Sequence, residues 1–131
     1  MRILIAEDDL TCRLLIQQFL KDLAPPDIAV NGKEAVEAVR LALEKGEPYD
    51  LICLDIMMPE MDGHEALKQI RAMEVADGKD PGTGAKIIMT TSLGDSKNVF
   101  ASFKSLCDGY LVKPITNETL QEELRKLRLI E

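Results

Sequence analysis

Cysteine is scarce in this chain, and no apolar run approaches the length of a transmembrane helix. The three cysteines, Cys12, Cys53 and Cys107, are odd in number and have no spacing that suits a metal site. We therefore expect reduced, mostly buried thiols in a cytoplasmic protein. Acids interrupt the first apolar stretch, residues 1–6, so it is too short for a signal peptide.

Basic residues are in the minority, and a glycine-rich phosphate loop is absent. Acids outnumber bases 23 to 16, which gives a net charge of −7 and a pI of about 4.8. This balance argues against nucleic acid or an anionic membrane as the main partner. A nucleotide hydrolase would need a glycine-rich loop ending in Lys-Ser/Thr, and the chain has none.

The residues that are present predict a single α/β domain. A chain of 131 residues, 46% apolar and 30% charged, is typical of one soluble globular domain. Five short apolar runs alternate with helical patterns; the expected strands are Ile3–Ala6, Ile28–Val30, Leu51–Leu54, Lys86–Thr90 and Gly109–Val112. Because these runs are apolar on both faces and separated by helices, we expect a parallel sheet covered on both sides.

Helix signals lie between the expected strands. The first helix is predicted from about Leu10 to Leu23, where residues 24–27 break it. Asn31 and Glu34 have the form of a capping box at the start of the second helix. The later helices are recognised by their N-caps or apolar positions, namely Asp62, Val99, Phe100, Phe103 and Thr116.

Unusual polar residues follow four of the five expected strands. They are Glu7, Asp8 and Asp9 after the first, Asp55 after the third, Thr91 after the fourth and Lys113 after the last. In open parallel sheets, ligands bind outside the carboxyl ends of the strands. A carboxylate at a buried strand tip is costly unless something pairs with it. Acids, a hydroxyl and a lysine at one edge describe a metal-assisted phosphoryl-transfer site.

These motifs resemble the receiver domains of two-component response regulators, and among them the stand-alone chemotaxis regulators. The resemblance rests on the acidic pair, on Asp55 followed by residues 58–63 (Met-Pro-Glu-Met-Asp-Gly), on Thr91, and on Tyr110 with Lys113-Pro114. It implies a flavodoxin-like, doubly wound five-stranded parallel sheet of order 2-1-3-4-5, with helices on both faces. We expect one receiver domain over residues 1–131 with no output domain, a signalling protein and not an enzyme acting on other molecules.

The resemblance also implies a role for each site residue. Asp55 would accept a phosphoryl group from a phosphohistidine on a sensor histidine kinase or a histidine phosphotransfer protein. Lys113 and the Thr91 hydroxyl would contact phosphoryl oxygens. Mg²⁺, or Mn²⁺, would be held by Asp8, Asp55, the backbone carbonyl of Met57 and, partly through water, Glu7. Because clustered carboxylates repel one another, the empty site should favour a divalent cation.

The three adjacent acids leave a question of register. Arg13 lies five residues after Asp8, a spacing that the family usually shows between the arginine and the metal-ligating acid. We therefore expect Asp8 to be the direct ligand, with Glu7 as its neighbour. Asp9 would start the first helix, and its acting as the ligand instead stays open.

A two-state switch is the expected consequence of phosphorylation. In the family, Tyr110 turns inward when the Thr91 hydroxyl moves toward the phosphoryl group; an ordinary half-exposed strand tyrosine is the alternative. The peptide bond before Pro114 is expected to be cis and to aim Lys113 into the site. An unidentified downstream protein would then bind the surface formed by the fourth helix, the fifth strand and the fifth helix.

Other functions fit less well, and one alternative is kept. The acids after the first strand would repel the phosphate of a flavin, and a dehalogenase-type phosphatase normally has an aspartate where Met57 stands. In the family, polar side chains at the positions of Met57 and Leu93 can help to place the water that hydrolyses phosphoaspartate. Both residues are apolar here, so we expect a long-lived phosphoaspartate. The alternative is a receiver-fold adaptor independent of phosphorylation, which would have no need of Mg²⁺. The sequence does not identify the kinase, the target or the pathway.

Overall fold

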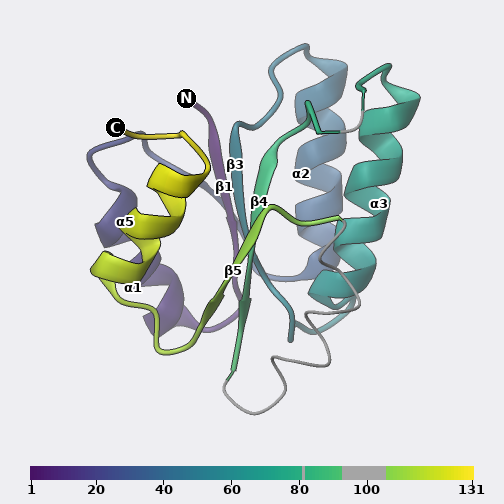
Figure 1. Ribbon diagram of the computed structural model, residues 1–131. Helices are drawn as coiled ribbons and strands as arrows, with labels where there is room; N and C mark the ends of the chain where they lie inside the picture. Colours follow the sequence, from purple (N-terminus) through teal and green to yellow (C-terminus); the bar gives the residue numbers. More distant parts are fainter. Residues whose placement is uncertain (81, 93–105) are drawn as a thin grey trace.

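The computed structural model describes residues 1–80, 82–92 and 106–131, in which a central sheet lies between two layers of helices (Figure 1). Five strands in this part of the chain form the sheet: β1 (Ile3–Ala6), β2 (Asp27–Ala29), β3 (Leu51–Asp55), β4 (Lys86–Thr91) and β5 (Gly109–Val112). Every neighbouring pair is parallel, and the order is β2-β1-β3-β4-β5. The flavodoxin-like sheet expected from the sequence is confirmed.

Helices cover both faces of this sheet. The described helices are α1 (Leu10–Leu20), α2 (Gly32–Glu44), α3 (Gly63–Ala76) and α5 (Asn117–Lys126). Figure 1 shows α1 and α5 on one face and α2 and α3 on the other. The helix predicted around Val99, Phe100 and Phe103 lies outside the described residues. Within those residues, no helix is both long enough and apolar enough to span a membrane.

Alternation along the strands divides the core into two clusters. In β1, Leu4 packs into the cluster on the α2–α3 side, whereas Ile3 and Ile5 pack into the cluster on the α1–α5 side. In β3, Ile52 and Cys53 divide in the same way. Successive strand residues point to opposite faces, and here both faces are covered, so the strands read as unbroken apolar runs.

The three cysteines are all free thiols. Cys53 is buried, while Cys12 and Cys107 are half-buried. The burial expected for these thiols is therefore complete only at Cys53. Burial raises the pKa of Cys12 and of Cys53 to about 12, and the Glu7 carboxylate adds to the effect at Cys12. These two thiols therefore stay protonated at neutral pH.

Five element boundaries differ from the predicted ones. Helix α1 ends at Leu20, one turn before the predicted Leu23, whose amide donates to the Leu20 carbonyl at 3.0 Å in a closing turn. Strand β2 starts and ends one residue earlier than predicted, at Asp27 and Ala29, because Asp27 pairs with Leu4 of β1. Strands β3 and β4 each continue one residue further, to Asp55 and Thr91, because both residues join the ladder. Two residues of the expected site are thus the last residues of their strands.

Side-chain caps start the helices as predicted, with one change. Asn31 accepts a hydrogen bond from the Glu34 amide at 2.8 Å, and Asp62 accepts one from the Glu65 amide at 2.9 Å. The Glu34 carboxylate accepts from the Val30 amide at 3.0 Å, so the return bond of the capping box falls one residue before the cap.

The start of β5 is tied to α3 by Arg71. The guanidinium donates to the Leu106 carbonyl at 2.7 Å, to Glu74 at 2.7 Å and to Asp108 at 2.9 Å. Glu74 is buried, so this pairing neutralises a charge that would otherwise be costly. Arg71 therefore holds the start of β5, the strand that leads to Lys113, against α3.

Replacing Tyr49 with phenylalanine is expected to lower the free energy of unfolding by about 1 kcal/mol at pH 7. The buried Tyr49 hydroxyl donates to Asp27 at 2.6 Å, and this bond links the start of β3 to β2. Burial, and then the bond to Asp27, raises the pKa of Tyr49 from 10.0 to about 12. The contribution of the phenol is therefore lost as the pH rises from 10 to 12, so the stability advantage of the native chain should disappear over that range. Urea unfolding of both proteins measures this, and equal stabilities at pH 7 would contradict it.

Candidate functional site

The carboxyl ends of the strands bring the predicted site residues to one edge of the sheet. Glu7 directly follows β1, Asp55 ends β3, Thr91 ends β4 and Lys113 directly follows β5. Backbone bonds continue the ladder past the strand tips: the Glu7 amide donates to Ala29 at 3.0 Å, and the Lys113 amide donates to Thr91 at 2.7 Å. These side chains therefore start from rigid backbone.

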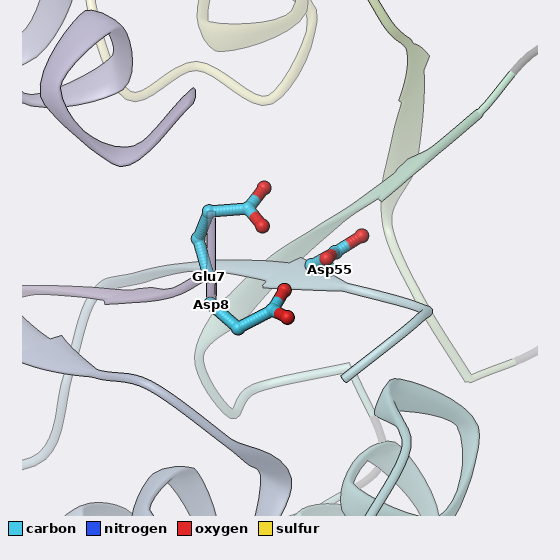
Figure 2. A group of neighbouring side chains, drawn as sticks. All are labelled: Glu7, Asp8 and Asp55. Carbon is cyan, nitrogen blue, oxygen red and sulfur yellow. The ribbon is translucent and has the colours of Figure 1, made fainter. Parts of the chain in front are cut away.

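Three carboxylates converge at this edge. One oxygen each of Glu7, Asp8 and Asp55 lies within 4.8 Å of the other two, and Figure 2 shows the carboxylates gathered beyond the strand ends. Glu7 and Asp55 are only 1% and 3% exposed, whereas Asp8 is exposed to solvent. The cluster is thus buried at Glu7 and Asp55 and open to solvent at Asp8.

Lys113 supplies a positive charge to the two buried acids. Its Nζ lies 2.8 Å from Glu7 Oε1 and 3.3 Å from Asp55 Oδ1. The Lys113–Pro114 peptide bond is cis. One ammonium group beside a cluster of three carboxylates leaves an excess of negative charge, which attracts a further cation.

The donor set fits a hard divalent cation. Carboxylate oxygens are the ligands that Mg²⁺ prefers, and the described site offers no thiolate or imidazole ligand beside them. Glu7 Oε1 is buried and accepts no well-aligned hydrogen bond from the described residues, although the Lys113 ammonium lies close to it. Buried carboxylates are costly unless they are paired, and a bound cation would add to the pairing that the single Lys113 ammonium provides.

The pKa values of the two buried acids, Asp55 and Glu7, are shifted in opposite directions. Burial, followed by the hydrogen bond and charge of Glu7, raises the pKa of Asp55 to about 7, although Lys113 acts against it. At Glu7, burial also raises the pKa, but the interactions with Asp55 and Lys113 outweigh it and the pKa is lowered. Without a metal ion, Asp55 is therefore the acid that is protonated first.

The geometry separates the roles of the adjacent acids. Asp9 caps α1: its carboxylate accepts from the Cys12 amide at 2.8 Å, and its own amide donates to Glu7 at 3.2 Å. Arg13 donates to the Glu7 backbone carbonyl at 3.1 Å, which holds the residues leading into α1. Asp8 belongs to the carboxylate cluster and Asp9 does not. This arrangement favours the register in which Asp8 faces a metal.

The remaining predicted residues, Thr91, Tyr110 and Met57, differ in how far they are buried. Thr91 is buried, and its hydroxyl donates to the Ser92 carbonyl at 3.4 Å. Tyr110 lies in β5 with 38% of its surface exposed, and Met57 has 68% exposed. Leu93 lies outside the described residues.

Two glycines lie in contact with the loop that carries Met57. A Cβ on Gly63 would lie 2.1 Å from the Asp55 backbone oxygen, and one on Gly32 would lie 2.1 Å from the Met61 oxygen. Gly63 belongs to the sequence motif that follows Asp55, whereas the sequence identifies Gly32 only as the residue after the Asn31 cap. The Asn-Gly pair was the available signal for Gly32, and nothing in it points to residue 61.

Comparison with known proteins agrees with this geometry. The family model of the response regulator receiver domain matches residues 3–125. The chain is 35% identical to a two-component response regulator of Oryza sativa subsp. japonica, over 98% of this chain and 94% of that protein. It is 34% identical to the chemotaxis protein CheY of Listeria monocytogenes serovar 1/2a, over 96% of this chain and 97% of the relative.

Solved structures show the same fold. The receiver domain of a sensor histidine kinase from Pseudomonas aeruginosa, described with a magnesium ion in its active site cleft, has a TM-score of 0.75 at 25% identity; the match covers 95% of this chain and 94% of that one. The receiver domain of a Saccharomyces cerevisiae response regulator, solved with a histidine phosphotransfer protein, has a TM-score of 0.78 at 27% identity. The match covers 96% of this chain and 87% of that one.

Proposed function

Because the chain belongs to the response regulator receiver domain family, we propose that it is a signalling switch controlled by phosphorylation of Asp55. The observation that carries this proposal is the buried pair of Glu7 and Asp55 with Lys113 between them, open on the Asp8 side. An Asp55 oxygen bonds to the phosphorus of a phosphohistidine while the P–N bond breaks, and the imidazole leaves after taking up a proton.

The carboxylates would hold Mg²⁺, or Mn²⁺, for this reaction. Asp8 and Asp55 are the proposed direct ligands together with the Met57 backbone carbonyl, and Glu7 would act partly through water. When bound, the ion offsets the negative charge that the phosphoryl group brings to the cluster. The magnesium ion described in the related kinase receiver supports this assignment.

Lys113 and Thr91 are proposed to hold the phosphoryl oxygens. The Lys113 ammonium already lies between two carboxylates, so it is placed to form an ion pair with an anion bound to Asp55. Thr91 ends the neighbouring strand, and its hydroxyl donates to the Ser92 carbonyl over a long distance of 3.4 Å. A hydrogen bond this long is broken at little cost.

The switch would be read on the surface around β5 and α5. Tyr110 is half exposed on β5 and is the proposed partner of Thr91 in the change of state. The helix predicted before β5, which completes the expected docking surface, lies outside the described residues. The downstream protein that binds there is not identified by any residue of this chain.

The phosphoryl donor must cover the surface next to Asp55. Leu10 and Leu14, one turn apart on α1, are 56% and 54% exposed, and Met57 beside the site is exposed too. These exposed apolar side chains, on the helix that follows the acidic pair and in the loop that follows Asp55, suit a protein donor, namely a cytoplasmic sensor histidine kinase or a histidine phosphotransfer protein. The yeast receiver solved with its phosphotransfer protein supports that choice. The apolar side chains of Met57 and Leu93 also underlie the hypothesis of a long-lived phosphoaspartate.

The test is phosphorylation of the native chain by acetyl phosphate, read by intact mass. We expect a gain of about 80 Da that requires Mg²⁺ and is prevented by a chelator. The adaptor independent of phosphorylation predicts no adduct and no binding of Mg²⁺. Absence of both would therefore replace the proposed switch with the adaptor.

A further inference from the structure

The loop between β3 and α3, residues 56–62, lies against the first turn of α2. The Gly32 amide, the first of that helix, donates to the Met61 carbonyl oxygen at 3.0 Å. Lys33, the next residue, forms an exposed ion pair with Glu60 at 3.7 Å. The loop that follows Asp55 is thus supported by a helix that contributes nothing to the carboxylate cluster.

Gly32 makes this contact because it has no side chain. A Cβ at this position would lie 2.1 Å from the Met61 carbonyl oxygen and 2.7 Å from the carbonyl carbon. Both atoms belong to the backbone, so no change of rotamer can relieve the overlap. Any larger residue at position 32 must move the loop, the helix or both.

The contact from α2 falls on a strained part of the loop. Glu60 has a φ of 68°, in the left-handed region that non-glycine residues rarely adopt. The Met61 amide donates to the Pro59 carbonyl at 2.7 Å and closes a three-residue turn around Glu60. Such conformations persist only where the surroundings hold them, and Gly32 and Lys33 hold the two residues concerned.

Both ends of the loop are fixed independently of α2. The Ile56 amide donates to Thr90 at 3.0 Å, and the Gly63 amide donates back to the Ile56 carbonyl at 2.8 Å. A displacement at Met61 therefore cannot be absorbed at the ends. It is taken up by the residues between them, among which is Met57.

We infer that Gly32 is a positioning residue for the phosphorylation site: the first turn of α2 holds the loop in the conformation that lets the Met57 carbonyl join Asp8 and Asp55 on Mg²⁺. This inference rests on the proposed function. Helix α2 would thus support the site from the side opposite to α1 and Lys113. The affinity for Mg²⁺ then depends on a residue that touches neither the metal nor the phosphoryl group.

The test compares Gly32→Ala with Gly46→Ala. Gly46 follows the other end of α2 with a φ of 70° and has nothing within 4 Å of its would-be Cβ, so alanine strains the chain there without touching the loop. Calorimetric titration with Mg²⁺ alone gives the affinity, and urea unfolding gives the stability. We expect both variants to unfold at lower urea, but only Gly32→Ala to bind Mg²⁺ about tenfold or more weakly.

A measurement on the native chain covers the case in which Gly32→Ala does not fold. The amide resonance of Gly32 should shift during a Mg²⁺ titration with the same affinity that calorimetry gives, while that of Gly46 stays in place. A silent Gly32 amide, or Gly32→Ala with native affinity, would overturn the inference alone. A native chain that binds no Mg²⁺ would overturn the proposed function and this inference with it.

Discussion

Replacing Asp55 with asparagine is expected to abolish the gain of about 80 Da that acetyl phosphate and Mg²⁺ produce. An amide oxygen is too weak a nucleophile to displace the donor, and the amide also removes one of the three clustered carboxylates. The matched control is Asp9→Asn, because asparagine retains the cap on α1 and Asp9 lies outside the cluster. The control should be phosphorylated at the native rate.

The same substitution is expected to stabilise the metal-free protein. Asp55 is 3% exposed and its pKa is raised from 3.8 to about 7, mainly by burial and then by Glu7. An acid with a raised pKa adds stability below its unfolded value and loses it as the pH rises, here from 3.8 to about 7. At pH 8 with a chelator, Asp55→Asn should therefore unfold with a free energy about 2 to 4 kcal/mol higher.

Urea unfolding from pH 4 to pH 8 measures this difference. The two proteins should be nearly equally stable at pH 4 and should diverge as the pH increases. Saturating Mg²⁺ should narrow the gap, because the ion stabilises only the native protein. An adduct that persists on Asp55→Asn, or a variant less stable than the native chain at pH 8, would contradict the role assigned to this residue.

Replacing Lys113 with methionine is expected to have the opposite effect on stability. The Lys113 ammonium faces two buried carboxylates, at 2.8 Å and 3.3 Å, and methionine retains the length of the side chain without its charge. Breaking a buried ion pair by removing one partner costs about 3 to 5 kcal/mol, because the remaining charge is left unpaired. That loss should appear at pH 8 in the presence of a chelator.

Three comparisons make the Lys113 result specific. The loss should shrink at pH 6, because without the lysine the pKa of Asp55 rises further and its carboxyl group becomes neutral. It should also shrink in Mg²⁺, which replaces part of the missing positive charge. Lys126→Met removes an exposed ion pair to Glu123, 3.3 Å long, and should cost less than about 1 kcal/mol. Equal losses for Lys113→Met and Lys126→Met would show that the buried acids do not depend on Lys113.

The fold was predictable because its strands are buried on both faces. Strands such as β1 and β3 read as unbroken apolar runs, and the carboxyl ends of parallel strands must lie at one edge. That alone brings Glu7, Asp55 and Lys113 together. β2 was misplaced by one residue because it is a three-residue edge strand, two of whose residues are exposed, so its pairing with β1 sets its start.

The sequence could not show how the charges in the site are shared. Glu7, Asp8 and Asp9 are chemically alike and adjacent, and only packing decides that Glu7 is buried, Asp8 exposed and Asp9 bound to the helix. The closer approach of Lys113 to Glu7 than to Asp55 depends on rotamers that no spacing encodes. The contact of Gly32 with Met61 joins residues distant in the chain.

The acids of the site come from the interior strands β1 and β3, whereas the amine comes from an edge strand. Lys113 follows β5, which pairs only with β4, yet its ammonium reaches Glu7 beyond β1 and Asp55 at the end of β3. The ion pair thus links the edge strand β5 to β3 and β1, past the end of β4. A phosphoryl group on Asp55 would compete with Glu7 for the Lys113 ammonium. The edge strand β5 would then be linked through Lys113 to β3 in the phosphorylated protein, and mainly to Glu7 beyond β1 in the unphosphorylated one.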